Sequence, residues 1–147
     1  MVVFNAPINF EVAETSRAAA TLDGVLMSYD STGKLDFAPA AGGTYDAVLI
    51  SEIVDLATYK DRYFIYTSID FGPYVQIGEM VSVAKGTKGL TVNGLAVTPG
   101  AGIPKGSHME IGANGRLVLH DAGVSVAVAL EAISSSAVKC GIVHLLV

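Results

Sequence analysis

Charged residues are scarce in this chain. Asp, Glu, Lys and Arg make up 16% of the 147 residues, and the nine basic side chains are scattered along the sequence. A nucleic-acid-binding protein needs clustered basic residues that neutralise phosphates, whereas the formal net charge here is −5. The composition therefore argues against a nucleic-acid partner. Because 51% of the residues are hydrophobic, we expect part of the surface to be covered in a homo-oligomer or a larger assembly.

Cysteine and long apolar runs are also scarce. The single cysteine, Cys140, cannot form an internal disulfide and stands in an apolar strand pattern, so we predict that it is a small core residue. No run approaches the roughly 20 apolar residues of a membrane helix, and no charged segment precedes an apolar one as in a signal peptide. We expect no membrane partner and synthesis in a cytoplasm.

No segment has the pattern of a helix of normal length. Instead, short apolar runs alternate with turn residues at intervals of roughly 8 to 12 residues, which is typical of all-β proteins. The pattern predicts an all-β barrel or sandwich of about nine to eleven short strands.

The last third of the chain gives the clearest strand pattern. Ser107–Ile111 alternates with period two, Asn114-Gly115 supplies a tight turn, and Arg116–Leu119 returns as the partner strand. Two further apolar runs, Val124–Ile133 and Val138–Val147, follow this hairpin. The same turn chemistry predicts another hairpin around Asn93-Gly94, in which residues 90–92 pair with residues 95–97.

The pattern of this hairpin occurs once before. Asp23–Leu35, with its own turn at residues 30–33, aligns without a gap on Lys105–Leu117, so that Gly24 matches Gly106, Met27 matches Met109 and Gly33 matches Gly115. Each copy is followed by a loop of small residues and an apolar strand. Chance similarity between two Gly-rich hairpins is one interpretation, because two copies are few for a repeat. The other interpretation is a barrel with two similar halves.

The N-terminal segment is apolar but contains Pro7, which disfavours a helix. We predict an extended arm over residues 1–18, followed by a single domain over residues 19–147. The arm is either a first strand of that domain or a segment that binds a neighbouring chain by adding a strand or filling a groove.

The order of these motifs resembles the head decoration (cement) proteins of tailed bacteriophages. The residues that carry the resemblance are Ile103-Pro104-Lys105-Gly106, Asn114-Gly115-Arg116, Val128–Ala132 and the final Gly141–Val147, with a weaker similarity over residues 20–50. The middle of the chain, residues 51–83, departs from the family pattern and is richer in tyrosine.

The resemblance implies a small β-barrel or β-tulip without enzymatic activity or cofactor. Such proteins commonly form homotrimers on the outer face of an expanded capsid and bridge neighbouring major capsid subunits. In that family an N-terminal segment often contacts the capsid or a neighbouring copy. On this chain the role falls on the arm residues Val2, Val3, Phe4, Asn5, Ile8 and Phe10.

The sequence lacks the residue patterns that are typical of catalytic and metal sites. The three histidines, His108, His120 and His144, lack metal-ligand spacing, although His108 and His120 could face each other across the hairpin. A G-x-S-x-G nucleophile motif is absent, and no helix is predicted after the Gly-rich loops at residues 86–89 and 100–102. We therefore predict no catalytic site and no metal site.

The alternative function is a ligand-binding β-barrel for a sugar or another small molecule. Its aromatic wall would be formed by Tyr63, Phe64, Tyr66 and Tyr74. Strand alternation places Tyr63 and Phe64 on opposite faces, so the aromatic residues do not all line one pocket. Core packing is the simpler explanation for them.

Overall fold

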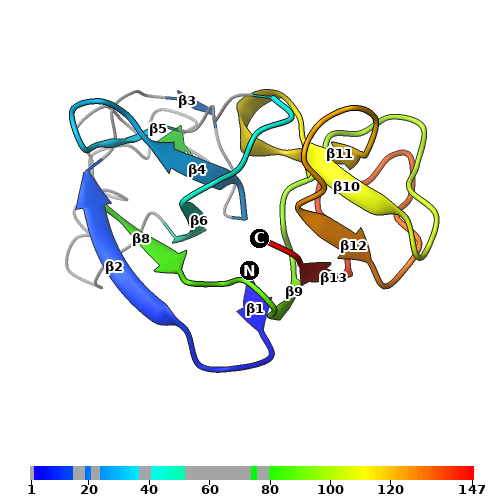
Figure 1. Ribbon diagram of the computed structural model, residues 1–147, viewed down its shortest axis with the longest axis horizontal. Coiled ribbons are helices and arrows are strands. Elements are labelled where there is room, and N and C mark those ends of the chain that lie inside the picture. Colours follow the sequence, from blue (N-terminus) through cyan, green and yellow to red (C-terminus); the bar gives the residue numbers. More distant parts are fainter. Residues whose placement is uncertain (1, 15–18, 21–23, 37–40, 52–73, 76–79) are drawn as a thin grey trace, which may run out of the picture.

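The computed structural model describes residues 2–14, 19–20, 24–36, 41–51, 74–75 and 80–147. Over these residues the protein is all-β, as predicted (Figure 1). Eleven strands form two sheets, in agreement with the predicted number. Two further short strands, β3 (Ala19–Ala20) and β7 (Tyr74–Val75), pair with each other.

The first sheet lies on the left in Figure 1 and has five strands. In spatial order these are β2 (Asn9–Glu14), β8 (Met80–Lys85), β6 (Ala47–Ser51), β4 (Leu26–Tyr29) and β5 (Leu35–Asp36). The predicted hairpin is confirmed, since β4 and β5 pair antiparallel. The Asp30 carboxylate holds its turn by accepting hydrogen bonds from the N–H groups of Thr32 (2.8 Å) and Lys34 (3.1 Å).

The second sheet lies on the right in Figure 1 and has six strands. In spatial order these are β1 (Val3–Phe4), β9 (Thr91–Asn93), β13 (Ile142–Leu145), β12 (Ala127–Ala129), β10 (His108–Ile111) and β11 (Leu117–Leu119). The predicted hairpin between β10 and β11 is confirmed. Its turn, assigned as the short 3-10 element η1 (Ala113–Gly115), has positive φ at both Asn114 (57°) and Gly115 (71°), as a type I′ turn requires.

The hairpin predicted around Asn93-Gly94 is wrong. Strand β9 pairs with β1 on one edge and with β13 on the other, so both of its edges are occupied. Residues 95–97 continue away from β9 instead. Ala96 forms a bridge with Lys139, and Val97 forms a parallel bridge with Leu117.

The second sheet is curled. The chain that leaves β9 reaches β11, near the opposite edge, where the Thr98 N–H donates to the Leu117 carbonyl (3.0 Å) and the Leu117 N–H donates to the Ala96 carbonyl (2.9 Å). The curl encloses fully buried side chains from five strands: Val92, Met109, Ile111, Leu117, Ala127, Val143 and Leu145.

The segment predicted as an N-terminal arm supplies β1 and β2. Strand β1 pairs with β9 of the second sheet, and β2 pairs along its full length with β8 of the first sheet. Over the described residues the segment therefore follows the alternative interpretation, in which it belongs to the same domain. The predicted boundary at residue 18 lies outside the described residues.

The two sheets repeat the same arrangement. Strands β2-β8-β6-β4-β5 of the first correspond in order to β9-β13-β12-β10-β11 of the second, which carries β1 in addition. Met27 faces Ala47 just as Met109 faces Ala127. Tyr29 faces Leu35 as Ile111 faces Leu117, and Leu49 faces Val83 as Ala129 faces Val143.

The backbone hydrogen bonds agree with this correspondence. The Gly24 N–H donates to Leu49 (2.6 Å), and the matching Gly106 N–H donates to Ala129 (2.7 Å). The internal similarity seen in the sequence is therefore one part of a repeated five-stranded unit. We call these two units the first half, which contains the first sheet, and the second half, which contains β9 to β13.

The inner strands of the first sheet, β4, β6 and β8, carry buried side chains on both faces. Met27, Ala47, Leu49 and Val83 pack in one apolar cluster, whereas Leu26, Val48 and Ala84 belong to the larger cluster, which holds the core of the second half. Because alternate side chains of a strand point to opposite faces, this division shows that the second set of side chains joins the two halves.

A polar contact also joins the halves. The Tyr45 hydroxyl donates to the Val147 carbonyl (2.8 Å) and lies 3.1 Å from the Thr87 hydroxyl. Burial raises the pKa of Tyr45, so this hydroxyl stays protonated at physiological pH.

The β10–β11 turn gives a first stability test. Val at position 115 would have to adopt the positive φ of Gly115, which is strained for a β-branched residue. We expect Gly115→Val to lower the free energy of unfolding by about 1–3 kcal/mol. Gly100→Val is the control, because Gly100 has an ordinary φ and a Cβ added there would meet no atom within 4 Å. Equal denaturation midpoints for the two variants would contradict the assigned turn.

A second test uses a pair of glycines at matching positions in the two halves. Gly24 and Gly106 share a positive φ (88° and 85°), so Ala at either position carries the same backbone strain. At Gly24 the added Cβ would also overlap the Gly94 carbonyl oxygen and lie 3.0 Å from Leu95 Cα, whereas at Gly106 it would meet nothing within 4 Å.

We expect Gly24→Ala to cost about 1–3 kcal/mol more than Gly106→Ala, as measured by denaturant unfolding. The backbone strain is the same in both variants. The difference between their losses of stability therefore measures the close approach of the two halves at Gly24. Equal losses of stability would show that the halves are not packed together at this point.

Candidate functional site

The second sheet has one buried face and one open face, and the open face is the candidate site. Cross-strand pairing defines its members. We call it the outer face, and it consists of Val3, Asn5, Thr91, Asn93, His108, Glu110, Val118, His120, Val128, Leu130, Ile142 and His144.

One row of the outer face is mostly apolar. It runs across four neighbouring chain segments as Val3, Asn93, Ile142 and Leu130. Val3 is 53% exposed and Leu130 is 40% exposed, although both are large hydrophobic residues. This row therefore presents an exposed apolar side chain at each of its two ends, Val3 and Leu130.

The adjacent row contains all three histidines of the chain. His144 faces Val128, Val128 faces His108, and the His120 N–H donates to the His108 carbonyl. His108 Nδ1 lies 2.6 Å from the Ser125 hydroxyl, and the rings of His108 and His120 are 6.5 Å apart at an interplanar angle of 63°. The expected approach of His108 and His120 across the hairpin is thus confirmed.

The place of His144 in this row was not predicted. It lies next to Val128 only because β13 pairs with β12, and this pairing cannot be read from local sequence.

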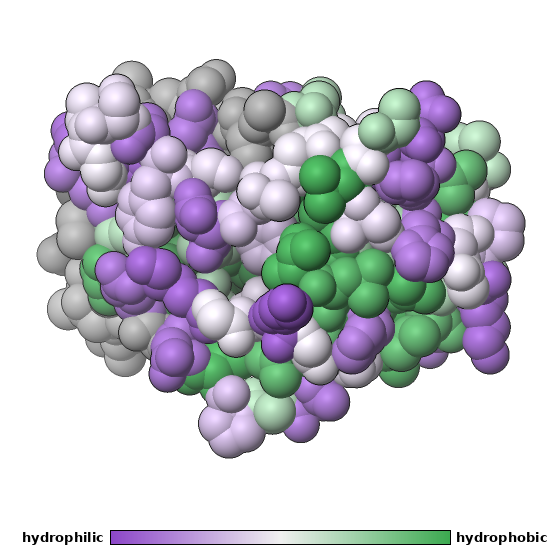
Figure 2. All heavy atoms as spheres, viewed as in Figure 1, coloured by the Kyte–Doolittle hydropathy of each residue, from purple (hydrophilic) through white to green (hydrophobic). Residues whose placement is uncertain are grey.

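Among its twelve members the outer face carries one charged side chain, Glu110. In Figure 2, hydrophobic side chains gather over the part of the molecule where β12 and β13 lie in Figure 1, with polar groups interspersed. Depletion of charge together with exposed apolar side chains is typical of the centre of a protein–protein interface. The arrangement favours binding of another protein surface.

The charged member of the outer face, Glu110 on β10, is held by hydrogen bonds from the backbone. Glu110 Oε2 accepts hydrogen bonds from the N–H groups of Asp121 (2.9 Å) and Gly123 (2.7 Å). These bonds, with a smaller contribution from the charge of His120, lower the pKa of Glu110. The carboxylate thus holds the loop beyond β11 beside the histidine row.

The predicted contact residues of the N-terminal segment do not all reach the surface. Val2 is 8% exposed, and Phe4 and Ile8 pack against the larger core cluster. Val3 and Asn5 are exposed and lie on the outer face, where Asn5 exchanges two hydrogen bonds of 3.0 Å with the backbone of Thr91. Phe10 pairs with Ala84 in the first sheet, and its side chain lies outside the described residues.

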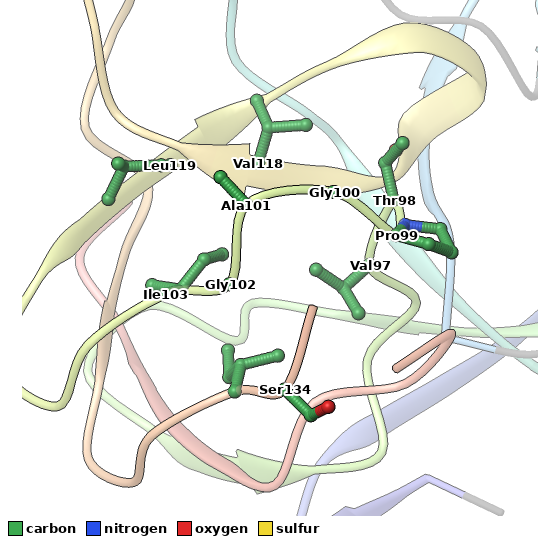
Figure 3. A pocket seen from close by; sticks show the side chains of 11 residues that line it. Val97, Thr98, Pro99, Gly100, Ala101, Gly102, Ile103, Val118, Leu119 and Ser134 are labelled. Atoms are coloured by element: carbon green, nitrogen blue, oxygen red, sulfur yellow. The ribbon is translucent and has the colours of Figure 1, made fainter. Parts of the chain in front are cut away.

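Two surface pockets are lined by described residues. The pocket in Figure 3 has a volume of about 240 Å³ and is formed by the loop at residues 97–103 together with Val118, Leu119, Ile133 and Ser134. A second pocket, of about 280 Å³, lies beside the N-terminal segment and Ile50. Neither lining contains a charged residue, a histidine or a cysteine.

Within the described ranges, no group of three or more His, Cys, Asp or Glu side chains is arranged to hold a metal ion. Over the same part of the chain, no helix has the length and apolar character needed to cross a membrane. Cys140 is a core residue, as predicted, and burial raises the pKa of its thiol to about 11. Its Sγ lies 3.2 Å from the Leu95 carbonyl oxygen.

The aromatic wall of the ligand-binding alternative falls outside the described side chains. Tyr63, Phe64 and Tyr66 belong to residues 52–73, and Tyr74 is placed in β7 by its backbone alone. Comparison with known proteins finds no matching family model and no matching curated protein.

The Glu110 contact predicts a pH-dependent stability difference. Because folding lowers the pKa of this carboxyl, its ionised form stabilises the fold above the pKa of the unfolded chain. This contribution is lost as the pH falls through the folded pKa. We expect Glu110→Gln to melt at a lower temperature than the wild type at neutral pH, and the difference to vanish once the wild-type carboxyl is protonated.

The control for this series is Glu11→Gln, which removes one carboxylate of a surface ion pair with Lys85 (2.9 Å). Surface ion pairs contribute little to stability. A difference between Glu110→Gln and the wild type that persists unchanged in acid would show that the loop does not depend on the charged form of Glu110.

Proposed function

We propose that this chain is a structural virion protein that binds the outer surface of an expanded phage capsid. In this proposal it acts as a homotrimer, bridges neighbouring major capsid subunits and has no enzymatic activity. The observation that supports it best is the partly apolar outer face, which has Glu110 as its one charged member and contains the predicted contact residues Val3 and Asn5. We also propose that the fold is a small β-barrel or β-tulip of the kind found in decoration proteins.

The physical task of such a protein is to add buried interface across subunit boundaries. Pressure from packaged genome must then break more contacts before the capsid subunits separate. A trimer engages several subunits at once, so each contact is allowed to be weak while the whole attachment is strong. An exposed face of moderate apolar character suits this requirement better than a deep ligand cavity.

The ligand-binding alternative gains less support from the described surface. Stacking of a sugar needs an aromatic side chain. The lining of the pocket in Figure 3 includes none, and the second pocket includes one, Phe4. The polar side chains of the pocket in Figure 3 are Thr98 and Ser134, which give few hydrogen-bonding groups to orient a small molecule.

The test is the mass of the purified protein in solution, followed by sedimentation with expanded empty phage heads. We expect a trimer that sediments with the expanded heads. Unexpanded heads are the control, because the proposal requires a surface that forms on expansion. A protein that stays in the supernatant with both kinds of head would refute the capsid role.

A further inference from the structure

The repeat makes each position on the outer face comparable with a position in the first half. By strand register, His108 corresponds to Leu26, Val128 to Val48 and His144 to Ala84. Leu130 corresponds in the same way to Ile50. The two halves therefore carry the same face of the same unit, and the surroundings of that face can be compared directly.

These surroundings differ. Leu26, Val48 and Ala84 are fully buried in the cluster shared with the second half. At the matching positions His108 is exposed, and Val128 and His144 are partly exposed. The face that joins the first half to the second half is thus left open on the second half.

The glycines show where the covered face makes its closest contact. The Gly24 carbonyl accepts a hydrogen bond from the Ala96 N–H (2.9 Å), and its Cα approaches Gly94 and Leu95. The first half therefore docks on the chain that leaves β9. A Cβ on the corresponding Gly106 would have no neighbour within 4 Å.

We infer that the outer face of the second sheet is the contact between copies of this chain, and that the contact is head to tail. The second half of one copy lies against the first half of the next, as the first half lies against the second within each chain. The inference concerns self-association and does not require the partner to be a capsid.

The receiving surface can be located from the register. Glu11 corresponds to Val92, so Ala13 and Glu14 at the end of β2 correspond to Gly94 and Leu95. Ala13 is buried, whereas the Glu14 side chain is 45% exposed. Glu14 is thus the open part of the segment that corresponds to the one receiving Gly24.

The chemistry of the two sides matches. Within the chain, Leu26 on the docking side and Leu95 on the receiving segment belong to the same buried apolar cluster. Between chains, the matching positions are His108 and Glu14, an imidazole and a carboxylate. An apolar pair of positions within the chain is thus matched by a polar pair between chains, which is the complementarity expected of a specific contact.

A second copy of this chain is the partner that fits the outer face. A heterologous contact either closes into a ring or extends as a filament. Each copy has one outer face and one receiving surface, so every copy in a ring satisfies both. A ring of three copies would contain six similar units, which agrees with the homotrimer of the proposed function.

The test uses one variant on each side of the contact. Leu130→Glu places a charge in the apolar row of the outer face, and Glu14→Lys reverses the charge of the receiving surface. Glu14 forms a surface ion pair with Lys34 (3.0 Å), whose loss has little effect on folding. Val138→Glu is the control, because Val138 is 48% exposed and lies outside the outer face.

Masses are measured by analytical ultracentrifugation without phage heads. We expect the wild type and Val138→Glu to form the same oligomer, and each of the other variants to weaken self-association at least about tenfold. A mixture of Leu130→Glu and Glu14→Lys should form a one-to-one dimer. This follows because Leu130→Glu retains the receiving surface and Glu14→Lys retains the outer face.

Three results would overturn the inference: a wild-type protein that is monomeric, a Leu130→Glu oligomer as stable as the wild type, or a mixture that stays monomeric. Circular dichroism confirms that each variant is folded, and Val3→Glu replaces Leu130→Glu if the latter unfolds. An oligomer that fails to sediment with heads would refute the capsid role and leave this inference standing.

Discussion

The fold depends on the burial of the first sheet against the second half. Leu26, Val48 and Ala84 have no exposed surface, although they lie on the face opposite the first sheet's own cluster. A sheet buried on both faces needs strands without polar alternation, and β4 and β6 meet this need with the runs Val25–Met27 and Ala47–Ile50. The high apolar content and low charge of the chain follow from this arrangement.

Close approach of backbone makes that burial possible. Gly24 brings the first half against the chain beyond β9, and the loop of the first half at Gly42 meets the second half at Gly123 and Ile111. The Gly42 N–H donates to the Ile111 carbonyl, and the Val124 N–H donates to the Gly42 carbonyl. Side chains at these glycines would separate the halves and expose the cluster between them.

The sequence was informative where structure is set locally. The two hairpins of β4–β5 and β10–β11 were predicted because Asp30–Gly33 and Asn114-Gly115 encode their turns in adjacent residues. The same reasoning was wrong at Asn93-Gly94, because β1 and β13 occupy both edges of β9 and come from the two ends of the chain. Turn chemistry cannot reveal a competing partner that is distant in sequence.

The candidate site shows the same limit. The approach of His108 and His120 follows from one hairpin, but the place of His144 depends on the order β10-β12-β13. Exposure of Val3 and burial of Val2 and Phe4 likewise depend on which face of β1 meets the core. Period-two alternation predicts that neighbouring residues differ, whereas the direction of the core comes from long-range pairing.

Fusion of two similar units in one chain has a consequence for how the surface can change. In an oligomer of single units, every substitution appears at all equivalent contacts, so a change that suits one environment must suit them all. Here the position of Leu26 and that of His108 are encoded separately. One copy of the face is the buried seam between the halves, and the other copy is open at the surface. Because the two copies are encoded separately, cohesion within the molecule and the chemistry of its surface can change independently.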